Sequence, residues 1–196
     1  MITTTPLPFA WPYALLYWSV SIWAFWPEFG IVRRARRAAG AKDAKSLQVI
    51  LFGLQVAMLA AFWVAWVPAL QITAHRVGSF LVGVAMLVAG ALLRRHCFRM
   101  LGSSFTGDVR ASADQQVVTR GAYAFVRHPS YTAAIIMNTG MGIALGSWAS
   151  ILILVVASFA VYTYRMIVEE RALLAAIGEP YERFMRTRKR VIPYVY

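Results

Sequence analysis

Long blocks of apolar residues alternate with shorter basic stretches along the whole chain. Several blocks approach the roughly 20 residues that a helix needs to cross a bilayer. We predict five membrane segments, at residues 9–26, 47–70, 77–93, 132–145 and 149–164. The fourth is short for a full span, so segments four and five should form a tight helical pair that turns at Gly146, Ser147 and Trp148. The predicted fold class is therefore an all-α polytopic membrane protein.

Composition supports a membrane protein and excludes an internally disulfide-bonded or thiolate-metal protein. Hydrophobic residues make up 60% of the chain, against about half in a soluble domain, and Trp and Tyr gather near several segment ends. The single cysteine, Cys97, excludes an internal disulfide and a thiolate metal cluster. Since the three histidines (His75, His96 and His128) do not pair at helical spacing, we expect no metal.

The positions of the basic residues predict the topology. Of the 20 Lys and Arg residues, 19 lie in the stretches 27–46, 94–131 and 165–196, and only Arg76 lies elsewhere. The positive-inside rule then places the N-terminus outside and the C-terminus in the cytoplasm, with five spans. This distribution explains the net charge of +12 without nucleic acid, because basic loops near a bilayer attract anionic headgroups. No Lys or Arg precedes the first segment, which argues against a cleaved signal peptide.

The helical pair should bring two polar pieces of the cytoplasmic face together. One piece is 94–131 and the other is 165–196. Because a helical hairpin returns the chain to the side that it left, we predict that Tyr131 and Arg165 are near neighbours. The sequence thus predicts a cytoplasmic-side pocket built from residues that are far apart in the chain.

The second piece, TYRMIVEERALLAAIG, reads as a continuation of the fifth helix that ends at Gly178, with Pro180 opening a further short helix. Arg165 and Glu169 are spaced i, i+4 and share one face. They form either an ordinary surface ion pair or, at membrane depth, a functional pair, because ionisable groups there are costly.

The first piece contains GAYAFVRHPSY at residues 121–131. Proline favours the start of a helix at about Pro129, and a helix N-terminus suits a carboxylate. His128 reads equally as a structural or interfacial residue, and Tyr123 and Tyr131 could belong to an aromatic belt. No P-loop, GxSxG or HExxH motif occurs, and the glycines at 83, 90, 140 and 142 indicate close helix packing instead.

Taken together, these motifs resemble the isoprenylcysteine carboxyl methyltransferase family of integral membrane enzymes. The pattern is G-x-Y-x-x-x-R-H-P-x-Y, then R-x-x-x-E-E-x-x-L, then G-x-x-Y, at Gly121, Tyr123, Arg127, His128, Pro129, Tyr131, Arg165, Glu169, Glu170, Leu173, Gly178 and Tyr181. The resemblance covers about 115–196, which it marks as the catalytic half. Residues 1–114 are similar only as transmembrane helices 1–3 and a connector.

The resemblance implies a cofactor, S-adenosylmethionine, with S-adenosylhomocysteine as its product. The residues implied to bind it are Gln115, Gln116, Val117, Val118, Tyr123, His128, Pro129, Ser130, Tyr131 and Glu169. Arg165 looks like the partner of the substrate carboxylate, and Arg165 and Glu169 are the implied catalytic pair. Whether Glu170, Tyr181 or Arg190 completes the site stays open.

The implied reaction is carboxyl O-methylation of an isoprenylcysteine-like or other lipophilic acceptor that enters from the bilayer. The compact chain favours a bacterial cytoplasmic membrane, with the site facing the cytoplasm. Relatives of this fold also methylate phospholipid amines or small thiols. The ending RKRVIPYVY resembles NADPH-dependent sterol and ene reductases, which lack the Glu169-Glu170 pair. A non-catalytic membrane scaffold is a third reading.

Overall fold

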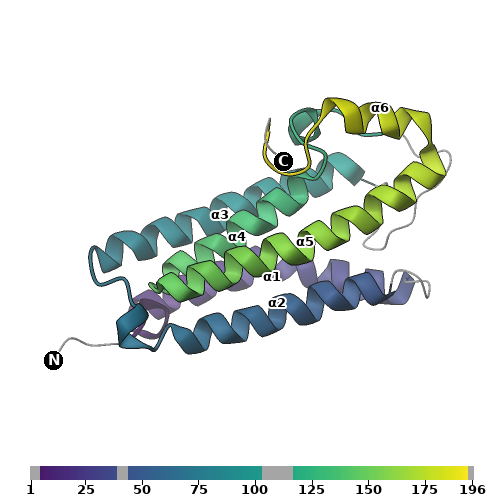
Figure 1. The fold of residues 1–196 in the computed structure, drawn as a ribbon. Coiled ribbons are helices and arrows are strands. Elements are labelled where there is room, and N and C mark those ends of the chain that lie inside the picture. Colours follow the sequence, from purple (N-terminus) through teal and green to yellow (C-terminus); the bar gives the residue numbers. More distant parts are fainter. Residues whose placement is uncertain (1–4, 39–43, 103–116, 194–196) are drawn as a thin grey trace.

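The structure, a computed structural model, describes residues 5–38, 44–102 and 117–193. The described residues form helices joined by loops, as the apolar pattern predicts (Figure 1). In these ranges the α-helices are α1 (Tyr13–Ala38), α2 (Ala44–Val64), α3 (Arg76–Leu101), α4 (Pro129–Ala144), α5 (Trp148–Ile177) and α6 (Glu179–Thr187). The same ranges contain the short 3₁₀ helices η1 (Leu7–Phe9), η2 (Pro68–Leu70) and η4 (Gly121–Ala124).

Helix α4 lies at the centre of the bundle, between α3 and α5, while α2 packs against α5 and α1 against α3 (Figure 1). The core between these helices is apolar. Its largest fully buried side chains include Phe80, Leu87, Met137 and Leu154. In lipid such a core is held together by close van der Waals packing between the helices.

Glycine allows α3 and α4 to approach closely. A Cβ atom added to Gly83 of α3 would lie 2.4 Å from the backbone N of Ala144, and one added to Gly140 would lie 2.7 Å from the backbone O of Gly83. A Cβ atom added to Gly90 of α3 would likewise lie 2.6 Å from the Cγ of Met137 in α4. The prediction that these glycines serve close helix packing is confirmed.

The turn between α4 and α5 lies where the sequence places it. Helix α4 ends at Ala144 and α5 begins at Trp148, after the N-cap residue Ser147, whose side chain accepts a hydrogen bond from the backbone N of Ser150. The backbone N of Ile72 donates to the O of Gly146 at 2.7 Å. This bond ties the α2–α3 connection to the α4–α5 turn at one end of the bundle.

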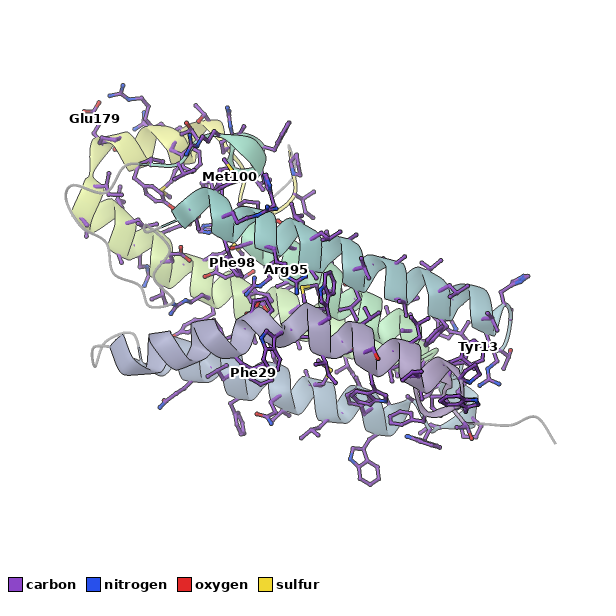
Figure 2. The ribbon with its side chains drawn as sticks, turned by 180° about the vertical axis from the view of Figure 1, so that it is seen from behind. Tyr13, Phe29, Arg95, Phe98, Met100 and Glu179 are labelled. Carbon is purple, nitrogen blue, oxygen red and sulfur yellow. The ribbon has the colours of Figure 1, made fainter. Side chains whose placement is uncertain are left out.

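Two helices, α3 and α5, are long and apolar enough to cross a membrane. Large apolar side chains point outward along the bundle, including Phe52, Trp63, Trp148 and Leu152, which are all more than 60% exposed. A surface of exposed apolar side chains is suited to contact with the lipid of a bilayer. In Figure 2, Tyr13 and Glu179 mark opposite ends of the bundle. Five spans and their orientation stay predictions.

Three helices do not end where the predicted apolar segments end. Helix α1 continues past residue 26 to Ala38, and α3 continues past residue 93 to Leu101. Arg and Ala are good helix formers, so the helices run on beyond the apolar blocks that we used to bound them. Helix α2 instead ends early, at Val64, shortly before Pro68 starts η2.

Candidate active site

At the end of the bundle opposite the α4–α5 turn, α6 and the residues after it fold back over the start of α4 (Figure 1). Gly178 ends α5 with φ 71°, a conformation that glycine adopts without strain, and Pro180 lies in the first turn of α6, as predicted. The tail then pairs with the backbone before α4. Arg127 N donates to Lys189 O at 2.8 Å, and His128 N donates to Arg190 O at 2.9 Å.

Glu170 is the buried centre of this junction. Its carboxylate, 4% exposed, accepts hydrogen bonds from Arg127 Nε at 3.0 Å and Arg190 Nη2 at 2.9 Å, and lies 3.1 Å from His128 Nε2. Three segments that are distant in the sequence therefore meet on one carboxylate. We call Glu170, Arg127, His128 and Arg190 the Glu170 cluster. Glu170 and Arg190 contact each other, while whether either residue completes the site stays open.

Glu169 contacts a different partner. The Tyr131 hydroxyl donates to Glu169 Oε2 at 2.7 Å and also interacts with the Arg165 side chain. The prediction that the helical pair brings Tyr131 beside Arg165 is confirmed. Because Arg165 is only 4% exposed, it does not belong to an ordinary surface ion pair.

Aromatic rings surround the two carboxylates. The Tyr131 ring stacks on His128 at 5.6 Å and on Tyr162 at 5.2 Å, so His128 and Glu169 share one environment through Tyr131. Burial raises the pKa of Tyr181, and the charges of Glu169 and Glu170 raise it further. Burial likewise raises the pKa of Tyr123, with smaller contributions from Cys97 and Glu169. Both phenols therefore stay protonated at neutral pH, as hydrogen-bond donors.

The other predicted cofactor residues lie before α4 or in its first turn. Pro129 and Ser130 are buried in the first turn of α4, and Val117 and Val118 are half-buried in the stretch before η4. Gln115 and Gln116 lie outside the described residues. A cofactor role for each of them stays a prediction. Within the described chain, no group of three or more His, Cys, Asp or Glu side chains could hold a metal ion.

Sequence reasoning missed a partly buried ion pair between α1 and α3. Arg94 donates to both carboxylate oxygens of Glu28, and its Nη1 donates to the backbone O of Ser130 at 2.6 Å. Arg94 thereby ties the first turn of α4 to both N-terminal helices. The available signal was that Glu28 and Arg94 each stand at the predicted cytoplasmic-side end of an apolar segment, where opposite charges can meet.

Comparison with known proteins shows which family this chain is similar to. The model of the isoprenylcysteine carboxyl methyltransferase (ICMT) family matches residues 83–175. The match starts within α3, earlier than the resemblance from residue 115 that the motifs indicated. It includes the Arg94 position as well as the Glu169-Glu170 pair.

Curated relatives agree with the family match. The protein-S-isoprenylcysteine O-methyltransferase of Schizosaccharomyces pombe is 31% identical over 57% of this chain and 48% of the relative. The enzyme of that name from Tribolium castaneum is 30% identical over 58% of this chain and 41% of the relative. This chain thus spans about half the length of these relatives.

A solved structure has the same fold. The eukaryotic intramembrane Ras methyltransferase ICMT superimposes with a TM-score of 0.61 at 27% identity, covering 72% of this chain and 51% of that one. The fold likeness extends beyond the residues that the family model matches. Sequence motifs, the family match over residues 83–175 and the fold likeness all make this chain similar to the isoprenylcysteine carboxyl methyltransferase family.

Proposed function

We propose that this protein is a membrane-embedded, S-adenosylmethionine-dependent methyltransferase that O-methylates the carboxylate of an isoprenylcysteine-like or other lipophilic acceptor. The observation that carries the proposal is that buried Arg165 and half-buried Glu169 both contact one hydroxyl, that of Tyr131, in a chain similar to this family. Placing a carboxylate and a guanidinium at the end of apolar helices costs free energy, and ionisable groups in such places usually have a functional role.

The residues around Glu169 fit the methyl donor. S-adenosylmethionine supplies an electrophilic methyl group and carries positive charge on its sulfonium and amino groups, which a carboxylate attracts. Glu169 provides that carboxylate. Tyr123 and Tyr181 are close enough to it that its charge raises the pKa of both hydroxyls. In this proposal the donor is held by Glu169 together with Gln115, Gln116, Val117, Val118, Tyr123, His128, Pro129, Ser130 and Tyr131.

Arg165 serves the acceptor in this proposal. A carboxylate acceptor is already ionised near neutral pH, so the reaction needs no general base. Arg165 can pair with that carboxylate through its planar, bidentate donors. The Tyr131 hydroxyl, which contacts both Arg165 and Glu169, keeps the two side chains in a constant relative position. Good orientation alone can lower a barrier by about 7–11 kcal/mol.

Membrane placement follows the same logic. The basic residues beside α3, α5 and α6 favour a cytoplasmic location for this end of the bundle, in a five-span topology. The acceptor's lipid tail would enter from the bilayer, and the polar donor from the cytoplasm. We retain the bacterial cytoplasmic membrane as the predicted location.

An NADPH-dependent reductase is the main alternative, because of the ending RKRVIPYVY. In the described part of that tail, Arg190 contacts Glu170, the residue that the similar reductases lack, and Lys189 pairs through its backbone with Arg127. The tail therefore has a structural role that does not require a nicotinamide cofactor, which weakens the reductase reading.

The deciding experiment is ligand-dependent thermal stabilisation of the detergent-purified protein. We expect S-adenosylhomocysteine to raise the melting temperature and NADP to leave it unchanged. The opposite result would favour the reductase, and no response to either ligand would favour a scaffold. Transfer of a labelled methyl group to prenylcysteine analogues, membrane lipids and small thiols, offered side by side, then separates a carboxylate acceptor from a phospholipid amine or a thiol.

A further inference from the structure

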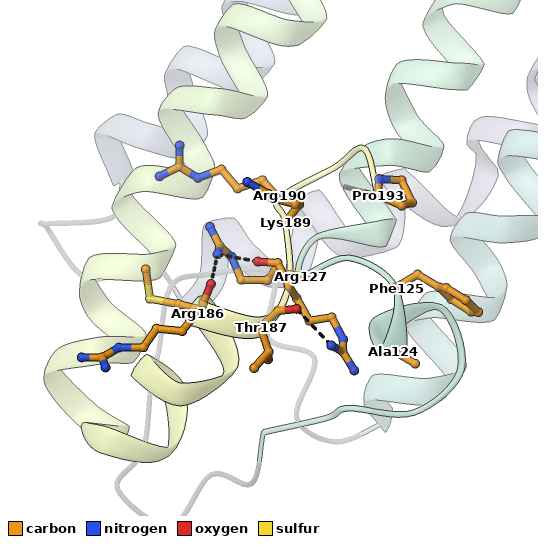
Figure 3. Close-up of a pocket in the computed structure, with 10 residues that line it drawn as sticks. Ala124, Phe125, Arg127, Arg186, Thr187, Lys189, Arg190 and Pro193 are labelled. Atoms are coloured by element: carbon orange, nitrogen blue, oxygen red, sulfur yellow. Dashed lines mark hydrogen bonds between the residues drawn. The ribbon is translucent and has the colours of Figure 1, made fainter. Parts of the chain in front are cut away.

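A cavity of about 610 Å³ lies between the residues before α4 and the tail after α6 (Figure 3). We call it the basic cavity. Its lining residues are Ala124, Phe125, Arg127, Met185, Arg186, Thr187, Arg188, Lys189, Arg190 and Pro193. Half of these side chains are cationic, and none is acidic. The cavity has no role in the methyl transfer proposed above.

Positive charge exceeds negative charge around the basic cavity. Arg127 and Arg190 share the single carboxylate of Glu170, and Arg186 pairs with Glu182 on the exposed face of α6. Arg188 donates to the backbone O of Thr187 through Nη1, but its buried Nε has no hydrogen-bond partner among the described residues. A buried donor without an acceptor is destabilising, and an anion in the cavity would supply the missing acceptor.

The charge of the basic cavity does not suit the methyl donor. At neutral pH S-adenosylmethionine carries a net positive charge, because its sulfonium and amino groups outweigh its carboxylate. A wall of arginines would repel it, whereas Glu169 and its tyrosine neighbours would attract it. The cavity and the donor site therefore select opposite charges, although both border the Glu170 cluster.

The shape of the lining suggests which anion binds. Ala124, Phe125 and Pro193 form an apolar edge, and Phe125 is 65% exposed. Arginine forks match phosphate oxygens in bidentate geometry, and basic clusters that border membrane helices attract anionic lipids. The cavity directly adjoins the start of α4, so a headgroup phosphate could reach the arginines while its glycerol backbone lies against the apolar edge.

We propose that the basic cavity is a binding site for the phosphate of an anionic phospholipid headgroup, bound chiefly by Arg188 and Lys189. The proposal rests on the membrane placement proposed above and not on the methyl transfer reaction. Its test therefore measures lipid binding, so it can fail while the methyltransferase proposal stands, and the reverse.

The experiment compares short-chain phosphatidylglycerol with short-chain phosphatidylcholine on the purified full chain in a neutral detergent. Native mass spectrometry counts bound lipid, and thermal melting gives an apparent affinity. We expect preferential binding of phosphatidylglycerol that weakens as salt is raised. The double variant Arg188→Gln/Lys189→Gln should lose about 10-fold or more in apparent affinity, since it removes charge-assisted hydrogen bonds. The variant Arg186→Gln/Lys189→Gln, which keeps Arg188, should also bind more weakly.

Arg183→Gln is the matched control. Arg183 lies on α6, is 73% exposed and pairs with Glu179, but it does not line the cavity. We expect it to bind phosphatidylglycerol like the wild type. Unchanged phosphatidylglycerol binding in both double variants would overturn the proposal, as would equal binding of the two lipids. So would equal stabilisation by inorganic phosphate, which would indicate a site for free anions. A double variant that lost S-adenosylhomocysteine or prenylcysteine binding instead would assign the cavity to the reaction.

Discussion

Glu169 and Glu170 are consecutive in α5, yet their carboxylates meet different partners. Glu170 is 4% exposed and contacts Arg127, Arg190 and His128, whereas Glu169 accepts a hydrogen bond from Tyr131 at 2.7 Å. Consecutive residues on a helix point about 100° apart, which permits this division. We infer that Glu170 holds the tail in place and that Glu169 is the carboxylate available to a ligand.

Replacing Glu169 with Gln should weaken binding of S-adenosylhomocysteine by about 10-fold or more, because a charge-assisted contact to its amino group becomes a neutral one. The amide keeps an oxygen that can accept from Tyr131, so folding should be little affected. Isothermal titration calorimetry on the detergent-purified variant measures the affinity. Glu179→Gln is the control, since Glu179 is 79% exposed and pairs only with its helical neighbour Arg183 among the described contacts. Equal affinities of the two variants would contradict the role of Glu169.

Replacing Arg165 with Ala should lower turnover of a carboxylate acceptor by at least about 100-fold, because a bidentate partner of the acceptor is lost. Affinity for S-adenosylhomocysteine should stay within about 3-fold of the wild type. The measurement is methyl transfer to a prenylcysteine analogue, with the donor affinity determined in parallel. Unchanged turnover would remove Arg165 from the acceptor site.

Replacing Glu170 with Gln should destabilise the protein by about 3 kcal/mol or more, because removal of one partner leaves buried charges uncompensated. The melting temperature should fall sharply, and proteolysis should reach the tail sooner. Glu182→Gln tests the contrast: its pair with Arg186 is exposed on α6 and should contribute less than about 1 kcal/mol. Similar melting temperatures for the two variants would show that Glu170 does not hold the tail.

Adding one methyl group at Gly83 should disturb the bundle. In Gly83→Ala the new Cβ would meet the backbone of α4 at 2.4 Å, and such overpacking typically costs about 1–3 kcal/mol. Gly30→Ala is the matched control, because nothing lies within 4 Å of the Cβ that it adds to α1. Thermal melting in one detergent should show a lower midpoint for Gly83→Ala alone. A normal midpoint would mean that α3 and α4 can separate without loss of stability.

The partly buried pair of Arg94 and Glu28 should behave non-additively. Arg94→Met or Glu28→Leu alone leaves one charge without its partner and should lower the melting temperature, whereas the double variant removes both charges and should recover part of the loss. A thermal-melting double-mutant cycle measures the coupling. Strictly additive effects would indicate that the two charges are solvated independently.

The sequence alone determined those features that depend on residues close together in the chain. Proline at 129 and 180 and glycine at 178 mark the starts of α4 and α6 and the end of α5, and the spacing of Arg165 and Glu169 places them on one helical face. The apolar pattern also predicted the α4–α5 hairpin, and with it the meeting of Tyr131 and Arg165. These are consequences of local backbone geometry and of helix period, which the sequence states directly.

Only the tertiary structure decided which of the two neighbouring glutamates meets the tail, how Arg94 reaches Glu28, and that a cavity lined by arginines separates the tail from η4. Each of these depends on how close the helices approach and how the tail pairs with the backbone at Arg127 and His128. Charges distant in the sequence have many possible partners, and packing selects one set by burying it. For that reason the Glu170 cluster could not be predicted from spacing.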